Sequence, residues 1–203
     1  MSEMSQDADH QETGQAQLEI TTVIQAQKGD EDAFNRLYLR YFLSIGIFLT
    51  HMVGNEEVGR ELTQETFLRA WMALDRLQHP GAFLGWLYQI ARNIARDYQR
   101  HTRCECYVYL NQEHDSIEDT RLVAPEAQAE AADLVRCALT AISSEYRACL
   151  IMYHIQGLPK PRIAEILSLK ESTVGTYISL GMSQLRKQLL QLDPNFGKDR
   201  SDQ

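Results

Sequence analysis

Apolar residues recur every three or four positions along most of the chain, which is the spacing of amphipathic helices. The N-terminal half holds three such runs, at residues 18–53, 56–77 and 84–103. Within the first run, Asp30 is placed to cap the helix that follows it. The turn-forming pairs Gly54-Asn55 and Pro80-Gly81 separate the three runs. We therefore expect this half of the chain to be helical.

The middle of the chain interrupts this pattern. Residues 104–130 have no sustained period and are rich in acids, although CECYVYL at their start is compatible with a short strand. Helical spacing then returns. The prediction is an all-α fold of two small helical domains, 18–103 and 131–192, joined by a flexible acidic linker at 104–130. A disordered acidic tail is expected at 1–17 and a second tail at 193–203.

Residues 158–185 have the form of a helix-turn-helix. A short helix from Lys160 to Leu167 is followed by a three-residue turn and a second helix that Ser172 or Glu171 would cap. The inward positions of the second helix are expected to be Val174, Ile178, Met182 and Leu185. An ordinary helical hairpin with no role in DNA binding is the alternative.

Charge is unevenly distributed over this acidic chain, whose formal net charge is -8. Residues 1–20 carry five acids and no Lys or Arg, and residues 104–133 carry eight acids against Arg121 alone. The two segments that look foldable are neutral to basic. Local charge is therefore a better guide to partners than the net charge of the whole chain.

Several classes of function find no support in the sequence. The N-terminus lacks a basic start and an apolar core, and no apolar run is long enough to span a membrane, so a cytoplasmic protein without membrane insertion is expected. No catalytic or phosphate-binding motif occurs, so we expect no enzyme, no small-molecule substrate and no cofactor. His101, Cys104 and Cys106 do not have the usual spacing of zinc ligands, and no metal site is expected.

One helix carries the positive charge that most needs an explanation. In LGWLYQIARNIARDYQRHTR, at 84–103, Arg92, Arg96 and Arg100 lie four residues apart and share one face. Such a stripe suits the phosphates of an opened DNA strand. The alternative is a stripe that is solvated or paired with acids.

Both halves of the chain resemble the small alternative sigma factors of bacterial RNA polymerase, the extracytoplasmic-function (ECF) class of the sigma-70 family. The opening helix KGDEDAFNRLYLRYF, the polymerase-binding helix ELTQETFLRAW and the -10 helix FLGWLYQIARNIARDYQR have counterparts in this family's region 2. ALTAISSEYRACLIMYHIQGL with the helix-turn-helix resembles its region 4. The resemblance covers about 21–103 and 133–190.

The resemblance implies a subunit that binds core RNA polymerase and directs transcription from specific promoters, with an anti-sigma factor as a further partner. It assigns roles to three sets of residues. The set implied to dock on the polymerase clamp is Leu62, Gln64, Glu65 and Phe67. The set implied for the -10 element is His79, Phe83, Arg92, Asn93, Arg96 and Arg100. The set implied for the -35 element is Lys170, Ser172, Thr173, Thr176, Tyr177 and Ser179.

The second helix of the helix-turn-helix departs from the family pattern. Gly175, Tyr177, Leu180 and Met182 stand where the family usually has arginines. This weakens the expected contact with DNA phosphates. Two alternatives therefore stay open: a helix-turn-helix regulator that acts without polymerase, and a degenerate sigma-like protein that binds polymerase or an anti-sigma partner without starting transcription.

Overall fold

The computed structural model describes residues 3–110 and 134–193. Its N-terminal half contains α1 (Glu3–Gln27), α2 (Glu31–Val53), α3 (Glu56–Ala73) and α4 (Phe83–Leu110), with short 3-10 turns at Leu74–Arg76 and Pro80–Ala82. Its C-terminal half contains a helical stretch at 134–140, α6 (Ser144–Leu150), a π-helical turn at Ile151–Ile155, α7 (Lys160–Leu167) and α8 (Glu171–Leu192). The described residues contain no strand, and the all-α prediction is confirmed.

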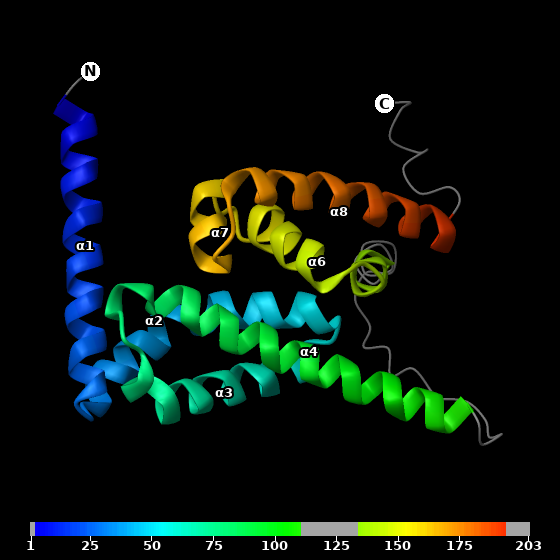
Figure 1. The fold of residues 1–203 in the computed structure, drawn as a ribbon, viewed down its shortest axis with the longest axis horizontal. Coiled ribbons are helices and arrows are strands. Elements are labelled where there is room, and N and C mark those ends of the chain that lie inside the picture. The colour runs from blue at the N-terminus through cyan, green and yellow to red at the C-terminus, as the bar shows by residue number, and fades with distance from the viewer. Residues whose placement is uncertain (1–2, 111–133, 194–203) are drawn as a thin grey trace, which may run out of the picture.

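Local signals in the sequence set the helix boundaries of the N-terminal half. Asp30 caps α2, since its Oδ1 accepts a hydrogen bond from the Ala33 N–H at 2.9 Å, as predicted. Gly54 ends α2 in the left-handed conformation, with φ of 77°. Asn55 then caps α3 by accepting from the Val58 N–H at 3.0 Å. The two helices consequently run antiparallel beside α4, with α1 across the end of this layer (Figure 1).

Two segments are helical where another state was expected. The predicted disordered tail at 1–17 is helical from Glu3 onward, because α1 is anchored by the buried residues Val23 and Ala26 and a helix extends cheaply once it is nucleated. CECYVYL is the last part of α4 rather than a strand or a linker, for the same reason. Residues 111–130 of the predicted linker, and the tail beyond 193, lie outside the described residues.

The two halves pack against each other instead of standing apart. α6, α7 and α8 lie on one side of the layer formed by α2, α3 and α4 (Figure 1). A single apolar cluster contains buried residues of both halves, among them Phe48 and Leu87 from the first and Ile151 and Ile163 from the second. The prediction of two helical domains is confirmed, and these domains also contact each other directly.

A buried arginine of α6 connects the two halves. Arg147 is 2% exposed. Its guanidinium donates to the carbonyl oxygen of Met52 in the last turn of α2, to that of Thr140 at 2.6 Å and to that of Ile142 at 2.8 Å. The carbonyls at a helix C-terminus carry partial negative charge, so a cation is favoured at the end of α2. Gln99 of α4 donates to the same Met52 oxygen at 2.6 Å.

Replacing Arg147 with Met should lower the free energy of unfolding by about 2–4 kcal/mol, because the substitution removes these hydrogen bonds and leaves buried carbonyls short of donors. Urea denaturation followed by circular dichroism would measure the change. The exposed Arg186, replaced in the same way, serves as the matched control and should shift the free energy by less than about 0.5 kcal/mol. Equal stabilities of the two variants would contradict the role given to Arg147.

Cys149 should react much more slowly than Cys137 with iodoacetamide. Its side chain is fully buried, and burial raises the pKa of its thiol to about 11, against a smaller opposing effect of Arg92. The reactive thiolate is then about one molecule in a thousand at pH 8, whereas Cys137 is exposed. Peptide mapping by mass spectrometry would compare the two rates, and equal alkylation would show that Cys149 is accessible in solution.

Candidate nucleic-acid interface

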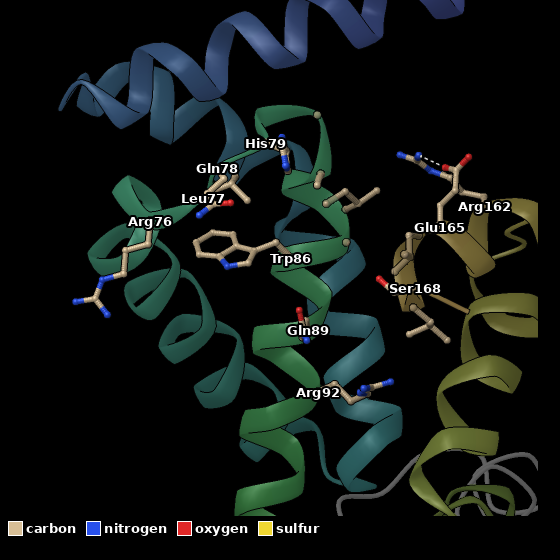
Figure 2. A pocket seen from close by; sticks show the side chains of 16 residues that line it. Arg76, Leu77, Gln78, His79, Trp86, Gln89, Arg92, Arg162, Glu165 and Ser168 are labelled. Carbon is tan, nitrogen blue, oxygen red and sulfur yellow. Dashed lines mark hydrogen bonds and ion pairs between the residues drawn. The ribbon is translucent and has the colours of Figure 1, made fainter. Parts of the chain in front are cut away.

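A groove of about 700 Å³ runs across α4, between the connection from α3 to α4 on one side and α7 on the other (Figure 2). Of the six residues predicted to contact the -10 element, His79 and Arg92 line this groove, whereas Phe83, Asn93, Arg96 and Arg100 do not. Its charged, aromatic and amide lining residues are Arg76, Gln78, His79, Trp86, Gln89, Arg92, Arg162 and Glu165.

Trp86 is the aromatic side chain of this groove. Its ring extends from α4 toward Leu77 and Gln78 in the connection before the helix, where His79 is also exposed (Figure 2). Sequence reasoning placed Trp86 in the core because it shares a helix face with Ile90, but both residues are only half-buried. They lie at the edge of the apolar stripe, where periodicity does not separate core from surface.

Phe83, which was expected to line the groove, is fully buried. Its ring lies 6.0 Å from that of Tyr41 and 6.0 Å from that of Trp86, measured between centroids. It begins α4, where the first inward position of the helix meets α2. Phe83 therefore packs against Trp86 from the core side, and its own ring is not accessible to a ligand.

The arginine stripe of α4 is largely engaged within the protein. Arg96 pairs with Glu145 of α6 at 3.4 Å, and Arg100 pairs with Asp97 at 2.6 Å. Arg92 points toward the α7 side of the groove (Figure 2). Its Nε is buried and has no hydrogen-bond partner in the part of the chain that the structure describes. Asn93 is exposed on the same helix.

The residues expected to dock on polymerase divide into two groups. Leu62 and Phe67 are core residues, 8% and 3% exposed, and the Phe67 ring lies 4.8 Å from that of Tyr38. α3 packs against α2 and α4, and both side chains are buried in the core. Gln64 is exposed, and Glu65 pairs with Arg69 at 2.5 Å on the outer face of α3.

The outer face of α3 also carries apolar surface that sequence reasoning did not single out. Leu68 is 59% exposed and Met72 is 71% exposed. Beside Leu68 lies an apolar hollow of about 330 Å³ between α2 and α3, which Tyr38 and Trp71 help to line. Exposed large apolar side chains of this kind mark interaction surfaces when they gather in one place.

The helix-turn-helix is formed by α7 and α8, with Ser168 in the left-handed conformation at the turn. The N-cap position of α8 is Lys170 and has no side-chain hydrogen bond, so neither Ser172 nor Glu171 caps the helix as expected. Met182, expected inward, is 43% exposed, because the helix face it occupies lies beside the contact with α6 and α7 rather than in it.

The residues of α8 predicted to contact DNA offer mainly hydroxyl groups. Lys170 and Ser172 are exposed, and Thr173 is half-buried. Thr176 and Ser179 are exposed, but their hydroxyls donate to backbone carbonyls of their own helix, at 3.0 and 3.1 Å.

Tyr177 is half-buried and packs edge-on against Tyr146, with 5.1 Å between ring centroids. Its ring therefore belongs partly to the packing of α8 against α6.

Two further expectations concern metals and membranes. Among the described residues, no group of three or more His, Cys, Asp or Glu side chains is arranged to hold a metal ion. The side chains of Cys104 and Cys106 lie outside the described set. None of the helices in the described ranges is long and apolar enough to cross a membrane.

Comparisons with known proteins match this arrangement. The family model for Sigma-70 region 2 matches residues 37–104, and that for Sigma-70 region 4 matches residues 132–185. The ECF RNA polymerase sigma factor SigW of Bacillus subtilis is 30% identical over 179 residues, which cover 83% of this chain and 95% of SigW. The chain spans only 39% to 59% of the length of seven further curated relatives that it matches.

Solved structures share the fold. CnrH in complex with the cytosolic domain of CnrY superimposes with a TM-score of 0.63 at 23% identity, covering 86% of this chain and 98% of that one. The sigma factor RpoE of Bartonella quintana, solved with the anti-sigma factor NepR, gives a TM-score of 0.56 at 19% identity, covering 79% and 98%. Both regions, in this order and on this fold, show that the chain belongs to the sigma-70 family of RNA polymerase sigma factors, in its ECF class.

Proposed function

We propose that this ECF sigma factor binds the opened strand of the promoter -10 element in the groove across α4. As a sigma factor, the chain binds core RNA polymerase and directs transcription from specific promoters. The observation that carries the finer proposal is the groove itself, in which Trp86 and Arg92 of α4, a helix of region 2, lie with Arg76 and His79 from the connection before it.

Trp86 stacks on a base that has left the duplex, because an extruded base needs an apolar wall to replace its neighbours in the stack. His79 lies at the mouth of the groove beside it. Asn93, with a donor and an acceptor on one amide, reads a base edge. Phe83 fixes the position of Trp86 from the core and is a positioning residue.

Cations on both sides of the groove hold the strand by its phosphates. Arg76 is exposed beside Trp86, and Arg92 lines the groove from α4. Arg96 and Arg100 extend the same helix face. Contacts to phosphate position the strand without reading its sequence, so specificity rests with Trp86, His79 and Asn93.

The outer face of α3 is the surface for core polymerase. Leu68 and Met72 supply exposed apolar area, and Gln64 and Glu65 supply polar contacts beside it. Leu68 and Met72 take the place of Leu62 and Phe67 in this proposed surface, because Leu62 and Phe67 are buried in the core of the protein. Because no residue of α3 lines the groove, one molecule can engage polymerase and DNA together.

The helix-turn-helix makes a weaker contact with the -35 element. The residues that offer surface for it are Lys170, at the N-cap position of α8, and Ser172, Thr173, Thr176 and Ser179 of the helix itself. Within these first turns of α8 only Lys170 is positively charged, so phosphate contacts contribute little affinity. Promoter choice therefore depends mainly on the -10 element.

An anti-sigma factor is the further partner that the comparisons support, since RpoE of Bartonella quintana was solved with one. Family membership favours the sigma factor over a helix-turn-helix regulator that acts without polymerase. Run-off transcription distinguishes an active sigma factor from a sigma-like protein that binds polymerase without starting transcription. Purified chain added to core RNA polymerase and genomic fragments yields specific transcripts only if the chain is an active sigma factor.

Replacing Trp86 with Ala should reduce run-off transcription by about tenfold or more, since base stacking on an aromatic side chain contributes about 1–3 kcal/mol. Binding of the variant to core polymerase should be unchanged. Gln89→Ala, in the same groove, is the matched control and should lose much less activity. Full activity of the Trp86 variant would remove the base-stacking role.

Replacing Leu68 with Glu should weaken binding to core polymerase by about tenfold, because it places a charge in an interface that buries apolar surface. Fluorescence anisotropy of labelled chain titrated with core enzyme measures this. Leu18→Glu makes the same change at a residue that is 65% exposed on α1 and should bind as the unmodified chain does. Equal losses for both variants would place the interface elsewhere.

A further inference from the structure

The connection between α3 and α4, residues 74–82, forms one side of the groove. Arg76 and His79 are its exposed cation and imidazole, and both line the groove (Figure 2). Arg76 ends the first 3-10 turn of the connection, and His79 directly precedes the second. Short 3-10 turns have weaker hydrogen-bond geometry than an α-helix, so contacts from elsewhere in the protein decide where these side chains point.

One of these contacts comes from the end of α1. The Gln27 side chain donates through its Nε2 to the carbonyl oxygen of Leu74 at 3.0 Å and to that of Leu77 at 2.7 Å. A side-chain amide has two N–H donors on one nitrogen, so a single residue can satisfy both carbonyls. The two carbonyls lie on either side of Arg76 in the chain, and Gln27 thereby holds the first 3-10 turn at both ends.

A second contact from α1 reaches the other 3-10 turn. A Cβ built on Gly81 would lie 3.6 Å from Cδ1 of Ile20, which places the Ile20 side chain beside Gly81 at ordinary packing distance. Ile20 and Gln27 are seven residues apart, which is about two helical turns, and they share one face of α1. One face of α1 therefore contacts the connection at both of its 3-10 turns.

The backbone that carries Gln27 is itself fixed. The Gly29 N–H donates to the Ala26 carbonyl oxygen at 3.0 Å, and Gly29 has a φ of 90°, in the left-handed region that glycine adopts at helix ends. Asp30 then caps α2. Gln27 is thus presented to the connection from a rigid junction of two helices, as a residue that orients a binding site needs to be.

We propose that Gln27 is a positioning residue for the groove: by holding the carbonyls of Leu74 and Leu77, it sets where Arg76 and His79 meet the -10 strand. The inference rests on the proposed function of the groove. Gln27 does not line the groove itself. Its loss therefore changes the discrimination between -10 sequences and leaves binding to core polymerase intact.

The test is run-off transcription with core RNA polymerase on two templates: a promoter found among the genomic fragments, and the same promoter with one base of its -10 element changed. Gln27→Glu keeps the shape of the side chain but turns a carboxylate without donors toward two carbonyl oxygens. It should lower transcription from the first template, and the ratio between the two templates, by about fivefold each.

Gln25→Glu is the matched control on the same helix. Gln25 is exposed, and its Oε1 accepts from Arg36 at 3.0 Å, which a carboxylate also does. This variant should keep the transcription and the template ratio of the unmodified chain. Fluorescence anisotropy should show that both variants bind core polymerase equally well.

Gln27→Met removes the donors without adding a charge, and it takes the place of Gln27→Glu if circular dichroism shows that the latter unfolds. Combined with His79→Ala, it also tests whether Gln27 acts through the connection. If it does, the double variant loses no more of the template ratio than the more affected single variant, because the two changes disturb one feature. Losses that multiply would show that Gln27 and His79 act independently and would overturn the proposal.

Two further results would overturn it: Gln27 variants that keep the template ratio, or variants that lose transcription from both templates equally together with binding to core polymerase. The second result is the one that a purely structural role of Gln27 predicts. Failure of the proposed function has a different signature. In that case Trp86→Ala transcribes as well as the unmodified chain, whatever the Gln27 variants do, and the inference is lost with it.

Discussion

The fold depends on one buried guanidinium. Arg147 of α6 donates to the last turn of α2 and to two carbonyls before α6, so the end of α2 and the start of the C-terminal half share a single cation. Such carbonyls carry partial negative charge and are costly to bury without donors. An arginine satisfies several of them at once because its donors are held in a fixed planar fork.

This connection makes α4 serve two purposes. Its inner face, with Leu87, Ala91 and Ile94, is buried in the core, and its outer face forms the floor of the groove. One edge of that outer face is covered by α7 and α6, while the edge near Trp86 stays open (Figure 2). The packing of the two halves therefore places α7 beside the arginine edge of the candidate DNA site.

The surfaces assigned to the partners are separate. Polymerase is assigned to the outer face of α3, through Leu68 and Met72, and the -10 strand to the groove across α4. The helix-turn-helix contributes hydroxyl groups and a single cation in the first turns of α8. In this assignment, electrostatic affinity for DNA comes mainly from the N-terminal half, even though the C-terminal half holds the helix-turn-helix, a motif that reads DNA in many proteins.

The sequence by itself determined the helices, because apolar period and capping residues are local. The cap at Asp30 and the all-α fold were predicted from it, and the quoted motifs indicated the sigma-factor family.

Only the tertiary structure decided which side chains of an apolar or mixed helix face are accessible to a partner. Leu62, Phe67 and Phe83 became core, while Trp86, at the edge of its stripe, became the wall of the groove. The pairing of Arg96 with Glu145 and the packing of the two halves join residues about fifty or more positions apart in the chain. Periodicity specifies which face of a helix is buried, but not which distant element buries it.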